Sequence, residues 1–191
     1  GALLACAISE AAKLGSDQRR HELLVGLRSL PQAMRTVLAK RLEIAEVAQR
    51  FAPPKRYWAV VGSGPNHVAA EEVRIKLSEL CYKSIAADVI EDKKHIDLSS
   101  EPLILVCAAG LQGSTADDVA KETAIFKAHK ATAIVIADEG EVRFSAAATI
   151  TVPSVEPALG FVLSAMVGHL FGYEAALAID ASARPLREMR E

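Results

Sequence analysis

The sequence predicts an α/β fold: a three-layer sandwich with a mostly parallel central sheet, preceded by helices. Three observations support this prediction. Short apolar runs alternate with longer segments of helical spacing, the runs are apolar throughout rather than at every second residue, and glycine-rich turns join some runs to the next helix. Strands that are apolar throughout are covered on both faces, as in parallel sheets between helical layers.

The amino-terminal part is expected to be helical. Residues 1–8 are apolar, but this stretch is too short to span a bilayer and has no basic start. Because the chain begins with Gly1 within a helical pattern, we expect a fragment of a longer protein. Residues 16–52 have helical spacing and predict one or two helices, with Pro31 near a helix start.

Two consecutive prolines end this segment, and strands then alternate with helices. Five apolar runs are predicted as strands: residues 58–61, 85–90, 103–108, 133–137 and 149–152. Three segments between or after them are predicted as helices: residues 66–83, 114–129 and 157–172. The chain is therefore divided into leading helices and linker, one domain, and a tail: residues 1–52, 53–180 and 181–191.

Composition argues against several classes of partner. Apolar residues make up 51% of the 191 residues, enough for a sizeable core. The net charge of -2, with basic and acidic residues interspersed, gives no basic patch, so we expect neither nucleic acid nor membrane as a partner. The three cysteines lack CxxC spacing, which suits reduced thiols in the cytoplasm. No two histidines have metal-ligand spacing, and we expect no metal and no cofactor.

The most informative segment follows the first run. A glycine-rich turn is formed by Gly62, Ser63 and Gly64. In the helix predicted after it, Glu72, Lys76 and Glu79 fall within roughly 60° of one another at about 100° per residue. We expect this edge to border a cleft at the carboxyl end of a strand, because such a turn often borders a small-molecule site. The same spacing also occurs as ordinary surface stabilisation of a helix, so the pattern alone leaves both interpretations open.

A second glycine-rich loop, residues 108–115, ends in Ser114 and Thr115 and could hold a phosphate. Alternatively, Ser114 and Asp117 form a capping box, in which case the carboxylate would repel a phosphate. The histidines His21, His129 and His169 are interpreted as structural or solvent-exposed.

From residue 57 to residue 97 the sequence resembles the second sugar isomerase (SIS) domain of the glutamine:fructose-6-phosphate amidotransferase family. The family pattern is Gly-x-Gly, a helix with Glu-x3-Lys-x2-Glu-x2-Tyr, and then a Lys-His pair. The matching residues here are Gly62, Gly64, Glu72, Lys76, Glu79, Tyr82, Lys94 and His95. The resemblance implies a flavodoxin-like SIS fold and the carboxyl-terminal half of an isomerase module that makes glucosamine 6-phosphate.

The resemblance also implies roles for four catalytic residues. His95 would assist ring opening, Glu79 would move the proton between C1 and C2, and Lys76 would stabilise the enediolate. Glu72 would orient its neighbours. Gly62, Ser63, Gly64, Ser114 and Thr115 are the candidate substrate-binding residues. Since the family histidine enters from the neighbouring subunit, a homodimer with a phosphosugar ligand is implied.

Two departures from the family leave activity open. The family's Lys-His-Gly-Pro is here Lys94-His95-Ile96-Asp97, and no lysine follows Lys130, whereas a tail lysine forms an imine with the sugar in the family. Arginine cannot replace it, because a guanidinium stays protonated. The alternative is therefore a non-catalytic SIS module for phosphosugar binding or dimerisation. The sequence does not identify the sugar phosphate or the flanking domains.

Overall fold

The computed structural model describes residues 1–93 and 101–188, with side chains as far as residue 181. Five parallel strands form one sheet in the order β2-β1-β3-β4-β5. Their bounds are β1 Trp58–Gly62, β2 Ala86–Asp88, β3 Leu103–Cys107, β4 Thr132–Asp138 and β5 Ala148–Val152. The predicted fold class is confirmed, and so is the parallel sheet. The helix α5, Ile90–Lys93, begins at the last residue of the run predicted as the second strand.

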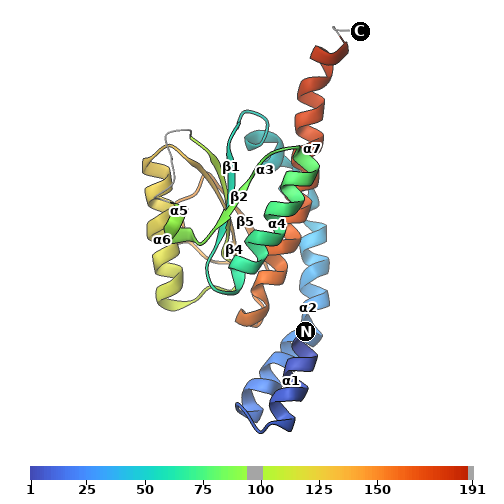
Figure 1. Cartoon of the computed structure of the whole chain (residues 1–191), viewed down its shortest axis with the longest axis vertical. Helices are drawn as coiled ribbons and strands as arrows, with labels where there is room; N and C mark the ends of the chain where they lie inside the picture. Colours follow the sequence, from blue (N-terminus) through green and yellow to red (C-terminus); the bar gives the residue numbers. More distant parts are fainter. Residues whose placement is uncertain (94–100, 189–191) are drawn as a thin grey trace.

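Helices cover both faces of this sheet, as Figure 1 shows. The remaining helices are α1 Ala2–Ala11, α2 Asp17–Ala39, α3 Arg41–Phe51, α4 Pro65–Cys81, α6 Gly113–Ala128, the short 3₁₀ helix η1 Pro157–Leu159 and α7 Gly160–Glu188. Side chains alternate between two cores along each strand: Val60 and Leu105 face α4, α7 and α3, whereas Val61 and Val106 face α6.

Two predicted helix boundaries are wrong. α2 runs through Pro31 instead of starting there, so the helix lacks one internal backbone hydrogen bond. α7 continues to Glu188, past the predicted end at Gly172. That glycine is a packing residue, because a Cβ there would lie 2.9 Å from Leu77 of α4.

Gly168 has the same role one turn earlier on α7. A Cβ at this position would lie 2.3 Å from Val73 of α4. The two glycines therefore let α7 approach α4 closely, and α7 forms the centre of one helical layer.

By length and composition, residues 157–181 could also cross a membrane. Leu163, Val167, Phe171 and Ala175 of this segment are nevertheless buried against the sheet and its helices. This burial is the pattern of a core helix in a globular domain.

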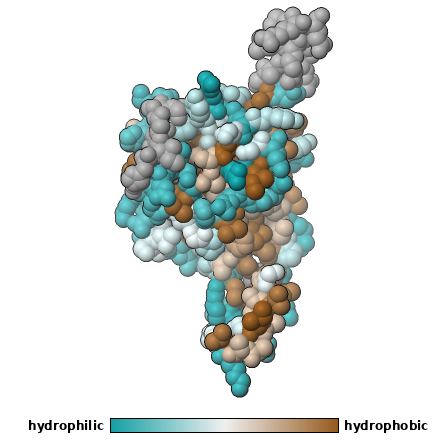
Figure 2. Space-filling view, in the orientation of Figure 1, coloured by the Kyte–Doolittle hydropathy of each residue, from teal (hydrophilic) through white to brown (hydrophobic). Residues whose placement is uncertain are grey.

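α1 and the start of α2 form an arm that projects from the body (Figure 1). No residue of α1 is buried. Figure 2 shows apolar side chains on this arm, and Leu3, Leu4 and Ile8 are 66%, 65% and 58% exposed. The arm is the least enclosed part of the fold, and the candidate site lies elsewhere.

Candidate functional site

A cleft of about 280 Å³ lies at the carboxyl ends of β1 and β3. The strand order reverses between these two strands, and ligands of open α/β sheets bind at such a switch point. The start of α4, the loop before α6, and η1 line the cleft. Three of the predicted substrate-binding residues are among the lining residues: Ser63, Gly64 and Thr115.

Two glycines allow the backbone turns around this cleft. A Cβ on Gly62 would lie 2.2 Å from the carbonyl oxygen of Asn66, so only glycine fits at the end of β1. Gly110 has a φ of 75°, and a Cβ there would lie 2.7 Å from the carbonyl oxygen of Pro157. Gly62 thus permits the turn beside the cleft without lining the cleft, whereas Gly110 lines it.

The start of α6 is open to an anion. Its N-cap is Gln112, which makes no side-chain capping hydrogen bond. The alternative of a capping box is wrong, because α6 begins at Gly113 and Ser114 lies inside its first turn. Asp117 pairs with Arg143, with Nη1 and Oδ1 2.8 Å apart, and Arg143 also pairs with Glu141, so the arginine offsets part of the negative charge near the helix start. The first N–H groups of a helix have no intrahelical partner and favour anions.

Hydroxyl groups accompany these N–H groups. Thr115 lines the cleft, whereas Ser114 is exposed on the same turn without lining it. The Oγ of Ser63 is buried and has no hydrogen-bond partner within the described part of the chain. A helix start with nearby hydroxyl donors is suited to a phosphate or another oxyanion.

A buried network fixes the start of α4 relative to the opposite wall. The Asn66 side-chain N–H donates to the carbonyl oxygen of Ala109 at 2.8 Å, and the Ser164 hydroxyl donates to Asn66 Oδ1 at 2.7 Å. The Ala109 N–H donates to Ser164 Oγ at 3.3 Å. Asn66 and Ser164 are 2% and 0% exposed, so these bonds are shielded from water. The network joins α4, the loop after β3, and α7.

The predicted catalytic residues of α4 do share one exposed edge. Lys76 Nζ lies 3.1 Å from Glu79 Oε2, and the side chains of Glu72, Lys76 and Glu79 are 45%, 40% and 60% exposed. None of the three lines the cleft. The expectation that they border it is therefore not met, and their catalytic role remains a proposal. His95 lies outside the described residues.

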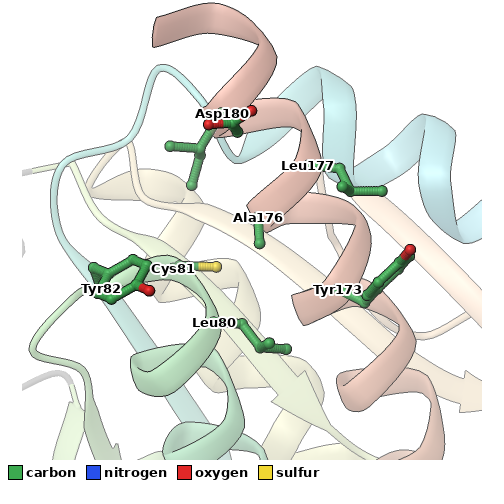
Figure 3. Close-up of a pocket in the computed structure, with 8 residues that line it drawn as sticks. Leu80, Cys81, Tyr82, Tyr173, Ala176, Leu177 and Asp180 are labelled. Carbon is green, nitrogen blue, oxygen red and sulfur yellow. The ribbon is translucent and has the colours of Figure 1, made fainter. Parts of the chain in front are cut away.

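A second hollow, of about 360 Å³, lies between the end of α4 and the middle of α7. Figure 3 shows Tyr82 and Cys81 from the α4 end opposite Tyr173 and Ala176 of α7. Burial raises the pKa of the Cys81 thiol to about 11, so this sulfur stays protonated and is a poor nucleophile. The hollow offers mainly apolar contact.

Three residues that the structure brings into or near these sites were not among the predicted site residues. Asn66 follows the glycine-rich turn, where its position at a helix start could have suggested a role, whereas Ser164 stands in an apolar segment without a motif. His169, interpreted as structural or exposed, places Nε2 3.2 Å from Glu72 Oε1. Contacts between side chains of different helices depend on the tertiary fold, which no local pattern encodes.

Among the described residues, no three His, Cys, Asp or Glu side chains are grouped so as to hold a metal ion. The cleft offers backbone N–H groups and hydroxyls, and α4 offers an ionisable edge.

Comparison with protein-family models finds no match. Among curated proteins, the chain is 29% identical over 180 residues to a glutamine–fructose-6-phosphate aminotransferase (isomerizing) of Thermus thermophilus. The match covers 92% of this chain and 30% of that protein. The chain thus spans less than a third of the length of its relative.

Solved structures share the fold. A C-terminal domain of glucosamine-fructose-6-phosphate aminotransferase from Francisella tularensis matches with a TM-score of 0.83 and 18% identity, over 93% of this chain and 51% of that one. The tagatose-6-phosphate ketose/aldose isomerase of Escherichia coli matches with a TM-score of 0.64 and 20% identity, over 78% of this chain and 43% of that one. In sequence and in fold, the chain therefore resembles the carboxyl-terminal SIS domain of the glutamine:fructose-6-phosphate amidotransferase family, as its motifs predict.

Proposed function

We propose that the chain binds a phosphosugar and is the carboxyl-terminal half of an isomerase module similar to that of the glutamine:fructose-6-phosphate amidotransferases. The observation that carries this proposal is the cleft at the switch point of the sheet. The uncapped start of α6 and the hydroxyl of Thr115 meet there, and these groups suit the phosphate of a sugar. Relatives and structural neighbours that act on sugar phosphates by name support the same ligand class.

The isomerising part of the proposal rests on the edge of α4. Moving a proton between adjacent carbons needs a positioned carboxylate and a cation for the developing enediolate charge. Glu79 and Lys76 supply this pair, 3.1 Å apart, and Glu72 lies one turn away on the same edge. In the family, His95 would complete the set from a second subunit, so the proposal includes a homodimer.

A specific observation favours the second candidate, a module that binds without catalysis. At 1.5 Å per residue, Glu72 lies about 10 Å and Glu79 about 21 Å along α4 from its first residue. Glu79 is therefore beyond the reach of a hexose phosphate whose phosphate sits at the cleft. No lysine follows Lys130 to form an imine. The isolated chain is accordingly proposed to bind ligand without forming glucosamine 6-phosphate. We also propose that it works in the cytoplasm, with neither nucleic acid nor membrane as a partner.

Isothermal titration of the chain with fructose 6-phosphate and with fructose tests the binding function. We expect binding of the phosphorylated sugar only, and about tenfold weaker binding after Thr115→Val, which removes one hydroxyl at nearly constant volume. Thr36→Val is the matched control, because that hydroxyl bonds within α2 to the carbonyl oxygen of Gln32. Equal affinity for both sugars, or an equal effect of the two substitutions, would contradict the proposal.

A further inference from the structure

The loop after β3 leaves the sheet at a defined residue. The Ala108 N–H still donates to the carbonyl oxygen of Ile136 in the neighbouring strand, at 2.9 Å. Beyond it, the backbone groups of Ala109 and Gly110 need partners outside the sheet, because buried N–H and C=O groups are almost always paired. These two residues lead directly into the wall of the cleft.

Side chains from three elements supply the partners. Asn66 of α4 and Ser164 of α7 bond the two backbone groups of Ala109. The Gly110 N–H donates to Oδ1 of Asp138 at 2.9 Å. Asp138 is the last residue of β4 and pairs with Val152 of β5, so its backbone is held by the sheet.

Asp138 does not line the cleft, but Gly110 does. The left-handed φ of 75° at Gly110 and the closeness of this residue to Pro157 of η1 leave little freedom for the loop between β3 and α6. A bound anion would attract every nearby N–H group. Because the Gly110 N–H is already bonded to the Asp138 carboxylate, it is not free to turn toward a bound anion, and the start of α6 is left as the backbone that can bind the ligand.

We propose that Asp138 is a positioning residue for phosphosugar binding, acting through the Gly110 N–H. This inference rests on the proposed function of the cleft. The fold alone needs only a hydrogen-bond acceptor for the Gly110 N–H. A carboxylate forms a shorter and stronger hydrogen bond than a neutral acceptor does, which explains why the acceptor is the charged side chain of Asp138. Burial raises the pKa of Asp138, a cost that a purely structural acceptor such as asparagine would not incur.

The test compares three variants of the chain by isothermal titration with fructose 6-phosphate. Asp138→Ala should weaken binding about tenfold, as expected for loss of one charge-assisted hydrogen bond. Asp138→Asn keeps an acceptor at the same place without the charge, so its affinity should lie between that of Asp138→Ala and that of the unaltered chain. Glu139→Gln is the matched control, since Glu139 contacts Lys40 at the surface and should leave binding unchanged.

A spectroscopic measurement separates positioning from folding. The backbone amide resonance of Gly110 should shift in Asp138→Ala and return toward its original position in Asp138→Asn. If the alanine variant does not fold, Asp138→Glu displaces the carboxylate by one methylene and carries the same expectation. Binding by Asp138→Ala equal to that of the unaltered chain would overturn this inference alone. Failure of the unaltered chain to prefer fructose 6-phosphate over fructose would instead overturn the proposed function and, with it, this inference.

Discussion

The hydroxyl of Ser164 is expected to contribute substantially to stability although it is a small group. It donates to Asn66 Oδ1 at 2.7 Å and accepts from the Ala109 N–H at 3.3 Å, in a position that is 0% exposed. Ser164→Ala would leave both of these groups buried without this partner. It would remove too little volume to open a cavity for a replacement water.

The size of the loss follows from these two bonds. A buried group left without its hydrogen bond costs about 1 to 3 kcal/mol. The Ala109 bond is long, so we place it at the low end of this range and expect about 3 kcal/mol in total. For a chain of 191 residues, this corresponds to a fall in the unfolding midpoint of about 6 to 12 °C.

Urea unfolding followed by circular dichroism measures this loss as a free energy of unfolding. Ser145→Ala is the control, because its hydroxyl accepts from Lys127 in an exposed position and should change stability by less than about 0.5 kcal/mol. In the double variant with Asn66→Ala, the two losses should not add, because both substitutions break the same bond. A loss below about 1 kcal/mol for Ser164→Ala, or full additivity in the double variant, would refute the assignment of this network as the anchor of the cleft.

Three further outcomes are expected. Gly168→Ala should destabilise the chain by about 1 to 3 kcal/mol in urea unfolding, through its clash with Val73. In a Val73→Ala background only the contact with the Cβ of residue 73, at 3.0 Å, remains, so the same substitution should cost clearly less; equal costs in both backgrounds would contradict the close packing of α7 on α4. Ellman's reagent at pH 8 should modify only the half-exposed Cys6, since burial raises the pKa of the other two thiols to about 11 and about 12; rapid modification of more than one thiol in the folded chain would contradict this. The isolated chain should form no glucosamine 6-phosphate from fructose 6-phosphate and ammonia; turnover that Glu79→Gln abolishes would restore the full synthase interpretation.

The order of strands and helices could be predicted because it depends on local features. The run at β3 is apolar at every position, and its residues are buried on both faces of the sheet. β2 is shorter than its run because it lies at the sheet edge, where only Ala86, Ala87 and Asp88 find partners on β1. The predicted helix end at Gly172 is wrong, because a glycine that permits helix packing looks the same in the sequence as one that ends a helix.

The candidate site could be predicted only in part, for a related reason. The turns at Gly62 and Gly110 are visible as glycine-rich loops after apolar runs. The residues that hold these loops come from elsewhere: Ser164 reaches Asn66 across 98 positions, and Asp138 reaches Gly110 from the end of another strand. These contacts depend on how whole helices and strands pack together, and local sequence spacing does not predict that packing.

The length of α4 bears on how the two candidate sites relate. Its first turn borders the cleft, whereas Glu79 lies about 21 Å further along the axis, well beyond the extent of one hexose phosphate. At this distance a sugar whose phosphate sits in the cleft does not reach Glu79 with its reacting carbons, so we expect the cleft and the ionisable edge to serve different bound molecules or different subunits. If the edge formed by Glu72, Lys76 and Glu79 is catalytic, we expect groups outside the described residues to hold its substrate. The exposure of these three side chains leaves room for such groups to approach. Binding at the cleft and catalysis at the edge are therefore separable properties, and the absence of turnover by the isolated chain would not count against the cleft.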